Sequence, residues 1–192
     1  AHVFNLINSW QMTNEKFLNI SGEKFCGKTH LINIFLEKNK GLKINSDELN
    51  NHYLKKMKFY KNVIIEDLTP NINEQLFYSL INIVEAENKS LIVTSDVSIV
   101  DMDFKLPDLK SRSKNFTLTS IEGPDDDLIF ALVLKNLSDR QISIDKKLID
   151  YIIKRIDRSY SNISDFIYTI DQLSLKKKKS IDFKIIKEAL GD

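Results

Sequence analysis

Cysteine is almost missing from this sequence, which holds a single one, Cys26, in 192 residues. One cysteine excludes the internal disulfide framework of small secreted domains and suits a reducing compartment. The three histidines, His2, His30 and His52, lack the spacing that zinc ligands show. The composition therefore predicts a cytoplasmic protein with neither a disulfide scaffold nor a zinc site.

Long apolar runs and an excess of one charge are missing too. No apolar stretch approaches the ~20 residues of a membrane-spanning helix, and no signal peptide is visible, so we expect no membrane association. The chain has 28 basic and 27 acidic residues, a net charge of +1, which provides no overall field to recruit DNA. The lysine run 176–179 is expected to be a solvated loop, with a contact to the DNA backbone as the alternative.

Glycine and proline are scarce as well, with five and three residues, so each one is informative about turns. Two of the glycines frame a segment that fits the phosphate-loop pattern G-x-x-x-x-G-K-[ST], and it reads Gly22-Glu23-Lys24-Phe25-Cys26-Gly27-Lys28-Thr29. An apolar run over 17–20 precedes it, and a helical pattern that begins at Thr29 and His30 follows it. A strand, a tight loop and a helix start would aim backbone N–H groups and the helix dipole at one point.

This context predicts that residues 22–30 bind the phosphates of a nucleotide. Lys28 is expected to reach the β- and γ-phosphates, and the Thr29 hydroxyl to ligate Mg²⁺. The alternative is a chance match within a loop. Phe25 stands where many such loops carry glycine, which tolerates a positive φ cheaply, so it either has an ordinary backbone conformation or strains the loop. We expect the loop to hold nucleotide more than to turn it over.

A second candidate element is a buried-type strand over 62–65 that ends in two acids, Glu66 and Asp67. Carboxylates at the C-terminal edge of a parallel sheet lie beside such a loop. Glu66 falls in the position expected to hold Mg²⁺, and Asp67 in the position that orients or activates the attacking water. The commoner order is Asp then Glu, and a misplacement of about 1 Å can cost ~100-fold in rate. The alternative is a strand end with solvated acids.

Two more segments could contribute polar groups to catalysis. Asp96 closes Thr94-Ser95-Asp96, after a strand expected over 90–94, where it could reach the γ-phosphate or the attacking water. The same three residues also read as an ordinary turn. Arg112, in the segment 106–112, could act as a finger on the nucleotide of a neighbouring subunit, and a simple surface arginine is the alternative.

Strands and helices alternate along the first two thirds of the chain. Strands are expected over 17–21, 42–45, 62–65, 90–94 and 116–118, with helices over 3–10, 29–38, 46–56, 73–87 and 109–113. This alternation implies a parallel sheet with helices on both faces. After Gly123-Pro124 only helices are expected, over 125–136, 145–157, 162–175 and 182–190, each begun by an Asp or Asn cap. We predict an α/β domain over 1–122, with a parallel five-stranded αβα sheet, and a small all-helical domain over 123–192.

Several segments, in their order and spacing, resemble the DnaA-type AAA+ ATPases. They are the phosphate loop with His30-Leu31, the strand end Ile65-Glu66-Asp67, Thr94-Ser95-Asp96, Leu109-Lys110-Ser111-Arg112 and the lid entry Ile121-Glu122-Gly123-Pro124-Asp125. The resemblance covers residues 2–190. Within the family, the segments 106–112 and 169–173 are most similar to the Hda branch of DnaA-related regulators. The resemblance implies a P-loop AAA+ fold whose helical domain is a lid.

The resemblance also implies roles for individual residues. Lys28 and Thr29 match the Walker A positions, Glu66 and Asp67 the Walker B positions, Asp96 sensor one, and Arg112 the arginine finger that acts across a subunit interface. Family members bind ATP or ADP, and Hda works with the DNA-loaded sliding clamp to make DnaA hydrolyse its ATP. The resemblance thus implies an adenine nucleotide with Mg²⁺, the partners DnaA and the sliding clamp, and a possible homo-oligomer.

The sequence departs from the family pattern at several points. No helix-turn-helix domain follows residue 192, and the segment 46–61 is too short for the helical insertion of initiators, so we do not expect a full initiator. Ser164 stands near the place of the sensor-two arginine, and with Phe25 and Glu66 it predicts weak hydrolysis by the chain itself. Residues 1–16 lack the clamp-binding peptide of Hda-like proteins, and we expect that it was trimmed.

The sequence leaves functions from different classes open. The first is a regulatory protein that binds adenine nucleotide and acts on DnaA through Arg112, with weak or no direct binding to DNA. The second is the ATPase fragment of a replication initiator or helicase loader that acts on DNA. An ATPase with its own turnover is a third hypothesis, and Phe25, Glu66 and Ser164 argue against it.

Overall fold

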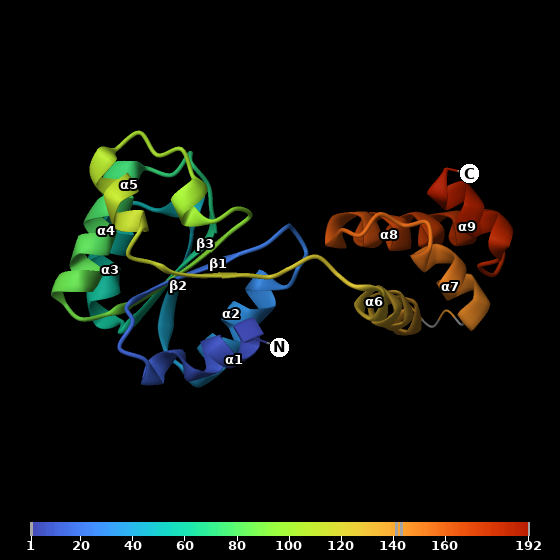
Figure 1. The fold of residues 1–192 in the computed structure, drawn as a ribbon, viewed down its shortest axis with the longest axis horizontal. Helices are drawn as coiled ribbons and strands as arrows, with labels where there is room; N and C mark the ends of the chain where they lie inside the picture. Colours follow the sequence, from blue (N-terminus) through green and yellow to red (C-terminus); the bar gives the residue numbers. More distant parts are fainter. Residues whose placement is uncertain (1, 141, 143, 192) are drawn as a thin grey trace. The chain divides into compact units, whose positions relative to one another are not determined.

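The chain folds into two compact units, one that ends at Glu122 and one that begins at Gly123. The computed structural model describes residues 2–140, 142 and 144–191. A β-sheet lies in the first unit, whereas every regular element described in the second unit is a helix (Figure 1). In the described part of the chain, no helix combines the length and the apolar character that crossing a membrane requires.

The sheet of the first unit has five parallel strands in the order β2-β3-β4-β1-β5. They are β1 (Phe17–Ser21), β2 (Gly41–Asn45), β3 (Asn62–Leu68), β4 (Ser90–Ser95) and β5 (Thr117–Ser120). All five residues of β1 are buried, as expected for a parallel strand with a helical layer on each face. The predicted five-stranded parallel αβα fold is confirmed.

Helices cover both faces of this sheet (Figure 1). On one face lie α1 (His2–Ser9) and α2 (Lys28–Lys38), and on the other α3 (Asn51–Lys56), α4 (Glu74–Ala86) and α5 (Pro107–Ser113). Alternate strand residues serve the two layers, because successive side chains of a strand point to opposite faces. Ile64 of β3 packs in the cluster of α1 and α2, while its neighbours Val63 and Ile65 pack in the cluster of α4 and α5.

Two predicted elements of this unit differ from the structure by more than two residues at one end. The helix expected over 46–56 is a 3₁₀ turn, Ser46–Glu48, followed by the separate helix α3. The break arises because the Asn50 side chain accepts the backbone N–H groups of His52 and Tyr53, which starts a new helix there. The strand expected to end at Ile65 continues to Leu68, with a register shift between Ile65 and Leu68.

The second unit contains α6 (Asp126–Asp139), α7 (Lys146–Ile153), α8 (Tyr160–Lys177) and α9 (Phe183–Leu190). Side chains cap all four helices, because Asp125, Asp145, Ser159 and Asp182 each accept a backbone N–H from the first turn. The cap predicted for the third helix, Asn162, is three residues late, because Ser159 is the N-cap. The helices bury an aliphatic core that includes Ile129, Val133, Ile149, Ile152, Ile163, Phe166, Ile170 and Ile186.

Candidate functional site

The phosphate loop connects β1 to α2, as its sequence pattern predicts. Gly27 occupies the N-cap of α2 with φ of 98°, a left-handed conformation that glycine adopts without steric cost, and it supplies no side-chain cap. The first N–H groups of a helix have no intrahelical acceptor, so they remain donors for an anion. Gly22 has no space for a side chain, since a Cβ there would lie 2.8 Å from Cys26 Sγ and 3.1 Å from Ile121 Cβ.

Phe25 strains the loop and does not have an ordinary backbone conformation, the other possibility that its sequence position left open. Its φ is 67°, in the left-handed region, and its side chain is 66% exposed. A left-handed conformation costs a non-glycine residue roughly 1–2 kcal/mol. Because the ring is mostly exposed, its burial offsets little of this conformational cost.

Replacing Phe25 by asparagine is expected to raise the free energy of unfolding by about 0.5–1 kcal/mol, because asparagine tolerates the left-handed region better. Chemical denaturation of the nucleotide-free protein measures the change. Phe59→Asn is the matched control, since Phe59 is 87% exposed and is not among the residues with positive φ. An equal gain in both variants would mean that lost hydrophobic exposure, and not backbone strain, causes it.

Lys28 is buried at the start of α2 and its ammonium group is fully engaged. Its Nζ donates to the carbonyl oxygens of Gly22 and Glu23 and lies 3.1 Å from Asp96 Oδ1. Burial raises the pKa of the nearby Cys26 thiol, and the charge of Lys28 acts in the opposite direction. The lysine head is therefore bound by the loop's own oxygens and by the acid that follows β4.

Asp67 is the acid of β3 that reaches the same place. Its φ is 52°, and both of its backbone polar groups are held: its N–H donates to Thr94 Oγ1 at 3.1 Å, and its carbonyl accepts from Ser46 Oγ at 2.7 Å. These two bonds fix the residue in a conformation that a β-strand would not otherwise adopt. The reversal of the backbone accompanies the register shift of β3 and leaves Asp67 exposed between buried neighbours.

Glu66, by contrast, is buried and is directed to a different partner. Its Oε2 lies 2.9 Å from Lys43 Nζ of β2, and its Oε1 is buried without a hydrogen-bond partner in the structure. The structure does not bring Glu66 together with Lys28. A buried carboxylate oxygen without a partner costs free energy, so a further ligand or hydrogen-bond donor at Oε1 would be stabilising.

A cavity of about 690 Å³ adjoins the phosphate loop, within the size range of small-molecule sites. Of the residues predicted from sequence, it is lined by Lys24, Phe25, Gly27, Lys28, Thr29, Asp67 and Asp96. Gly22, Glu23, Cys26, His30 and Glu66 are not among its lining residues. Sequence reasoning missed the other lining residues, Leu68, Thr69, Pro70, Val97 and Met102, which no motif marks.

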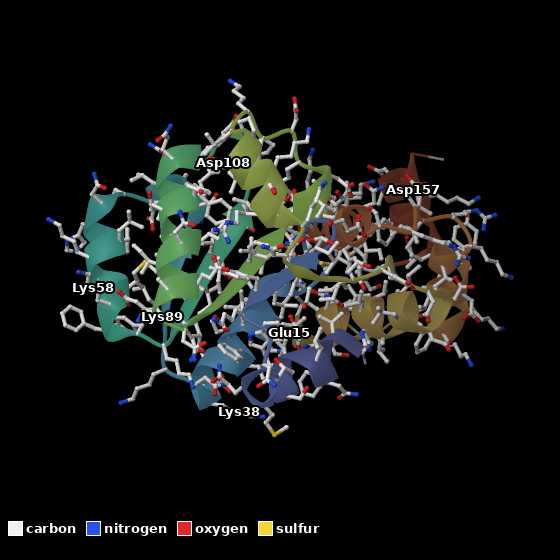
Figure 2. The ribbon with its side chains drawn as sticks, turned by 60° about the vertical axis from the view of Figure 1, so that its left-hand side comes forward. Glu15, Lys38, Lys58, Lys89, Asp108 and Asp157 are labelled. Atoms are coloured by element: carbon white, nitrogen blue, oxygen red, sulfur yellow. The ribbon has the colours of Figure 1, made fainter. Side chains whose placement is uncertain are left out.

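Arg112 lies away from this cavity, near the C-terminal end of α5. Figure 2 labels Asp108 in the first turn of the same helix. The Arg112 guanidinium pairs with Glu85 of α4, and about a third of the arginine side chain remains exposed. Within one chain, Arg112 is therefore held by an acid on the neighbouring helix.

No protein-family model matches this sequence. DnaA of Lachnoclostridium phytofermentans, a chromosomal replication initiator, is 26% identical over 191 residues, which cover 86% of this chain and 42% of that protein. Domain III of Thermotoga maritima DnaA has a similar fold, with a TM-score of 0.79 and 17% identity over 100% of this chain and 90% of that one.

The chain is thus similar to DnaA proteins in sequence and to a DnaA domain in fold. AMPPCP-bound DnaA of Aquifex aeolicus is another structural neighbour, with a TM-score of 0.67 and 19% identity over 91% of this chain and 61% of that one. The chain spans less than half the length of the curated DnaA proteins it matches. The resemblance inferred from the phosphate loop, the strand ends and the lid entry is thus confirmed at the level of the DnaA-type family.

Proposed function

We propose that this chain binds ATP or ADP in the cavity beside the phosphate loop. The observation that carries the proposal is the convergence there of Gly27, Lys28, Thr29, Asp67 and Asp96 from three separate strand ends. Backbone donors at a helix start, a buried ammonium group and a hydroxyl form the donor set that polyphosphate requires. That a DnaA of similar fold binds AMPPCP, an ATP analogue, supports an adenine nucleotide.

The residues present also fit Mg²⁺ bound through the nucleotide. Among the described residues, no group of three or more His, Cys, Asp or Glu side chains could hold a metal ion by itself. Mg²⁺ at nucleotide sites takes one or two protein ligands and completes its coordination with phosphates and water. We assign Thr29 as one ligand of the Mg²⁺. Of the two acids of β3, we assign Asp67 to the Mg²⁺ site, because it lines the cavity and Glu66 does not. Glu66 would join only by leaving Lys43.

The chain's own ATP hydrolysis is proposed to be weak. An exposed aromatic ring, Phe25, stands in the loop, and the acid in the metal-side position, Glu66, is paired elsewhere. Ser164, on an exposed position of α8, offers no guanidinium to a phosphate. We further propose that the first unit is the nucleotide-binding domain and that the helical unit serves as its lid.

For the biological role, we propose an Hda-like regulator of chromosomal replication initiation. It would act with the sliding clamp and stimulate ATP hydrolysis on DnaA, supplying Arg112 to the nucleotide of DnaA. The segment 106–112 supports this role, because it places an arginine near the end of a short helix, where its guanidinium pairs with an exposed carboxylate. A guanidinium held in this way can leave the carboxylate and pair with a phosphate bound to a partner protein.

A second candidate is the ATPase part of a replication initiator or helicase loader that acts on DNA. The relatives named above favour it, because they are replication initiators. Filter binding of the chain to single- and double-stranded DNA at several salt concentrations separates the two candidates. Tight, steeply salt-dependent binding would favour the DNA-acting function over the regulatory one.

The regulatory proposal is tested with DnaA loaded with labelled ATP and sliding clamp loaded on DNA. The full-length protein that contains this chain is added, and ADP formation is followed with and without the clamp. We expect ADP to form faster when both are present. No acceleration in any combination would reject the regulatory role, while fluorescence titration with a labelled ADP would still test nucleotide binding by itself.

A further inference from the structure

A lysine directly precedes four of the five strands of the sheet. In the spatial order of the strands, β2-β3-β4-β1, these residues are Lys40, Lys61, Lys89 and Lys16. Because all the strands are parallel, their first residues lie at one edge of the sheet, opposite the edge at which the phosphate loop follows β1. Neighbouring strands lie about 4.8 Å apart, so the four backbone positions form a row of about 15 Å. Figure 2 labels Lys89 at this edge.

One lysine of the row, Lys89, is a structural residue. Its side chain is buried, and its Nζ donates to the carbonyl oxygens of Lys58 at 3.3 Å and Tyr60 at 2.9 Å. The same atom lies 3.1 Å from Glu87 Oε2. These contacts fix the chain that enters β3, and with it the backbone of Lys61. Lys89 therefore supports this edge and is not available to a ligand.

The other three lysines of the row can reach a ligand. Lys40 and Lys61 are exposed and Lys16 is half-buried, and none of the three has an ion-pair partner among the residues that the structure describes. Lys16 Nζ donates to the backbone carbonyl oxygen of Glu85 at 3.4 Å. The carboxylates of Glu85 and Glu87, at the C-terminal end of α4, are each paired with another cation. They therefore leave the positive charge of the row unneutralised.

A polar pocket of about 270 Å³ lies at the same edge, and both Lys16 and Lys61 line it. Amide side chains form a further part of its lining, namely those of Gln11, Asn14 and Asn88. An acid, Glu15, lines it as well, and its Oε2 accepts from Thr117 Oγ1 at 3.4 Å. Ammonium and amide N–H groups are the donors that proteins use to hold phosphate oxygens. The row thus includes a concave site with the chemistry that a phosphate group requires.

We propose that this edge of the sheet, with Lys16, Lys40, Lys61 and the pocket, binds the phosphate backbone of duplex DNA. A lysine row favours DNA over a protein partner, because lysine is depleted at protein–protein interfaces, whereas lysine and arginine supply many contacts to phosphates. It favours a duplex over a single strand, because the duplex has the higher density of charge along its axis. The inference does not depend on the proposed nucleotide site, which lies at the opposite edge of the sheet, so both ligands can bind at once.

Fluorescence anisotropy of a labelled duplex of about 20 base pairs, measured at several salt concentrations with EDTA present, tests the proposal. We expect weak binding, with a dissociation constant on the order of 10⁻⁵ M near physiological salt. The logarithm of the binding constant should fall with the logarithm of the salt concentration with a slope of about −3, since each of three lysines displaces about one counter-ion. No binding even at low salt would overturn the proposal.

Substitutions of both signs test the row itself. Lys40→Gln combined with Lys61→Gln should weaken duplex binding about tenfold at low salt and bring the slope to about −1. Glu15→Gln should tighten binding about two- to threefold, because it removes a negative charge from the pocket. Lys178→Gln combined with Lys179→Gln is the matched control, since it removes two charges from exposed positions of the lysine run 176–179. It should change the affinity by less than about twofold.

Four outcomes would count against the proposal. Equal losses in the two double variants would assign binding to overall charge. Tighter binding of a single strand of the same length would overturn the choice of duplex DNA. Displacement of the duplex by polyglutamate as readily as by unlabelled duplex would assign the edge to an acidic protein. Loss of duplex binding in saturating ADP would place the DNA at the phosphate loop.

The same titrations separate this inference from the nucleotide proposal. A protein that does not bind ADP can still bind the duplex through the lysine row, and a protein that binds ADP can fail to bind the duplex. Circular dichroism of each variant confirms that the fold is retained before affinities are compared.

Discussion

Replacing Arg112 by alanine is expected to lower the stimulated rate of ATP hydrolysis on DnaA by roughly 10³-fold or more. A guanidinium supplied across an interface stabilises the charge that develops on the transferred phosphate. In the free chain Arg112 pairs with Glu85 of α4, so it must leave that carboxylate to act on a partner.

The rate of ADP formation on DnaA, with clamp and DNA present, measures this effect. Lys110→Ala is the control, because Lys110 is an exposed cation on the same helix and its loss should leave most of the stimulation. Glu85→Gln should retain or modestly increase the stimulation, since it releases Arg112. If Arg112→Ala and Lys110→Ala lost activity equally, a docking contact and not a catalytic cation would be the explanation.

The second large effect is expected from Lys28→Ala, which should weaken ADP binding by about 100-fold. Lys28 is the buried ammonium group of the cavity, and no other lysine of the loop is buried in this way. Isothermal titration calorimetry with ADP gives the affinity directly. The variant also leaves Asp96 without its ion-pair partner, so its stability must be recorded alongside.

The control for this variant lies on the same helix. Lys38, labelled in Figure 2, ends α2 and donates to Asn8 Oδ1 at 2.9 Å. Lys38→Ala removes the same charge about 15 Å along a helix of this length and should leave ADP affinity unchanged. Similar losses in Lys28→Ala and Lys38→Ala would exclude a specific phosphate contact by Lys28.

The order of strands and helices could be predicted from the sequence because buried parallel strands read as short apolar runs. Ile64 and Ile92 belong to such runs, and each lies in a strand of the sheet. The phosphate loop was also predictable, because its conformation depends on glycine at defined positions. Gly27 adopts the left-handed φ that the pattern requires. These features are local, so a short window of sequence contains them.

The different positions of the two acids of β3, Glu66 buried beside Lys43 and Asp67 in the cavity, could not be predicted in this way. It depends on Lys43 of the adjacent strand, which pairs with Glu66, and on Thr94 and Ser46, which hold Asp67 in a left-handed conformation. These partners lie 21 to 27 residues from Asp67 in sequence. Asn19 also could not be predicted, since in the sequence it is only an amide within an apolar run. The structure shows that its side chain donates to Ser95 Oγ and accepts the backbone N–H of Ile99.

The strand order has a consequence for how the chain folds as it is synthesised. The first strand made, β1, pairs only with β4 and β5, the last two strands of the sheet. The phosphate loop at its end therefore has no sheet to support it until β4, residues 90–95, has left the ribosome. At a synthesis rate of roughly 5–20 residues per second, this interval lasts several seconds, and the apolar strand β1 remains unpaired during it. Nucleotide cannot assist folding before that point, and chaperones have their best opportunity before it.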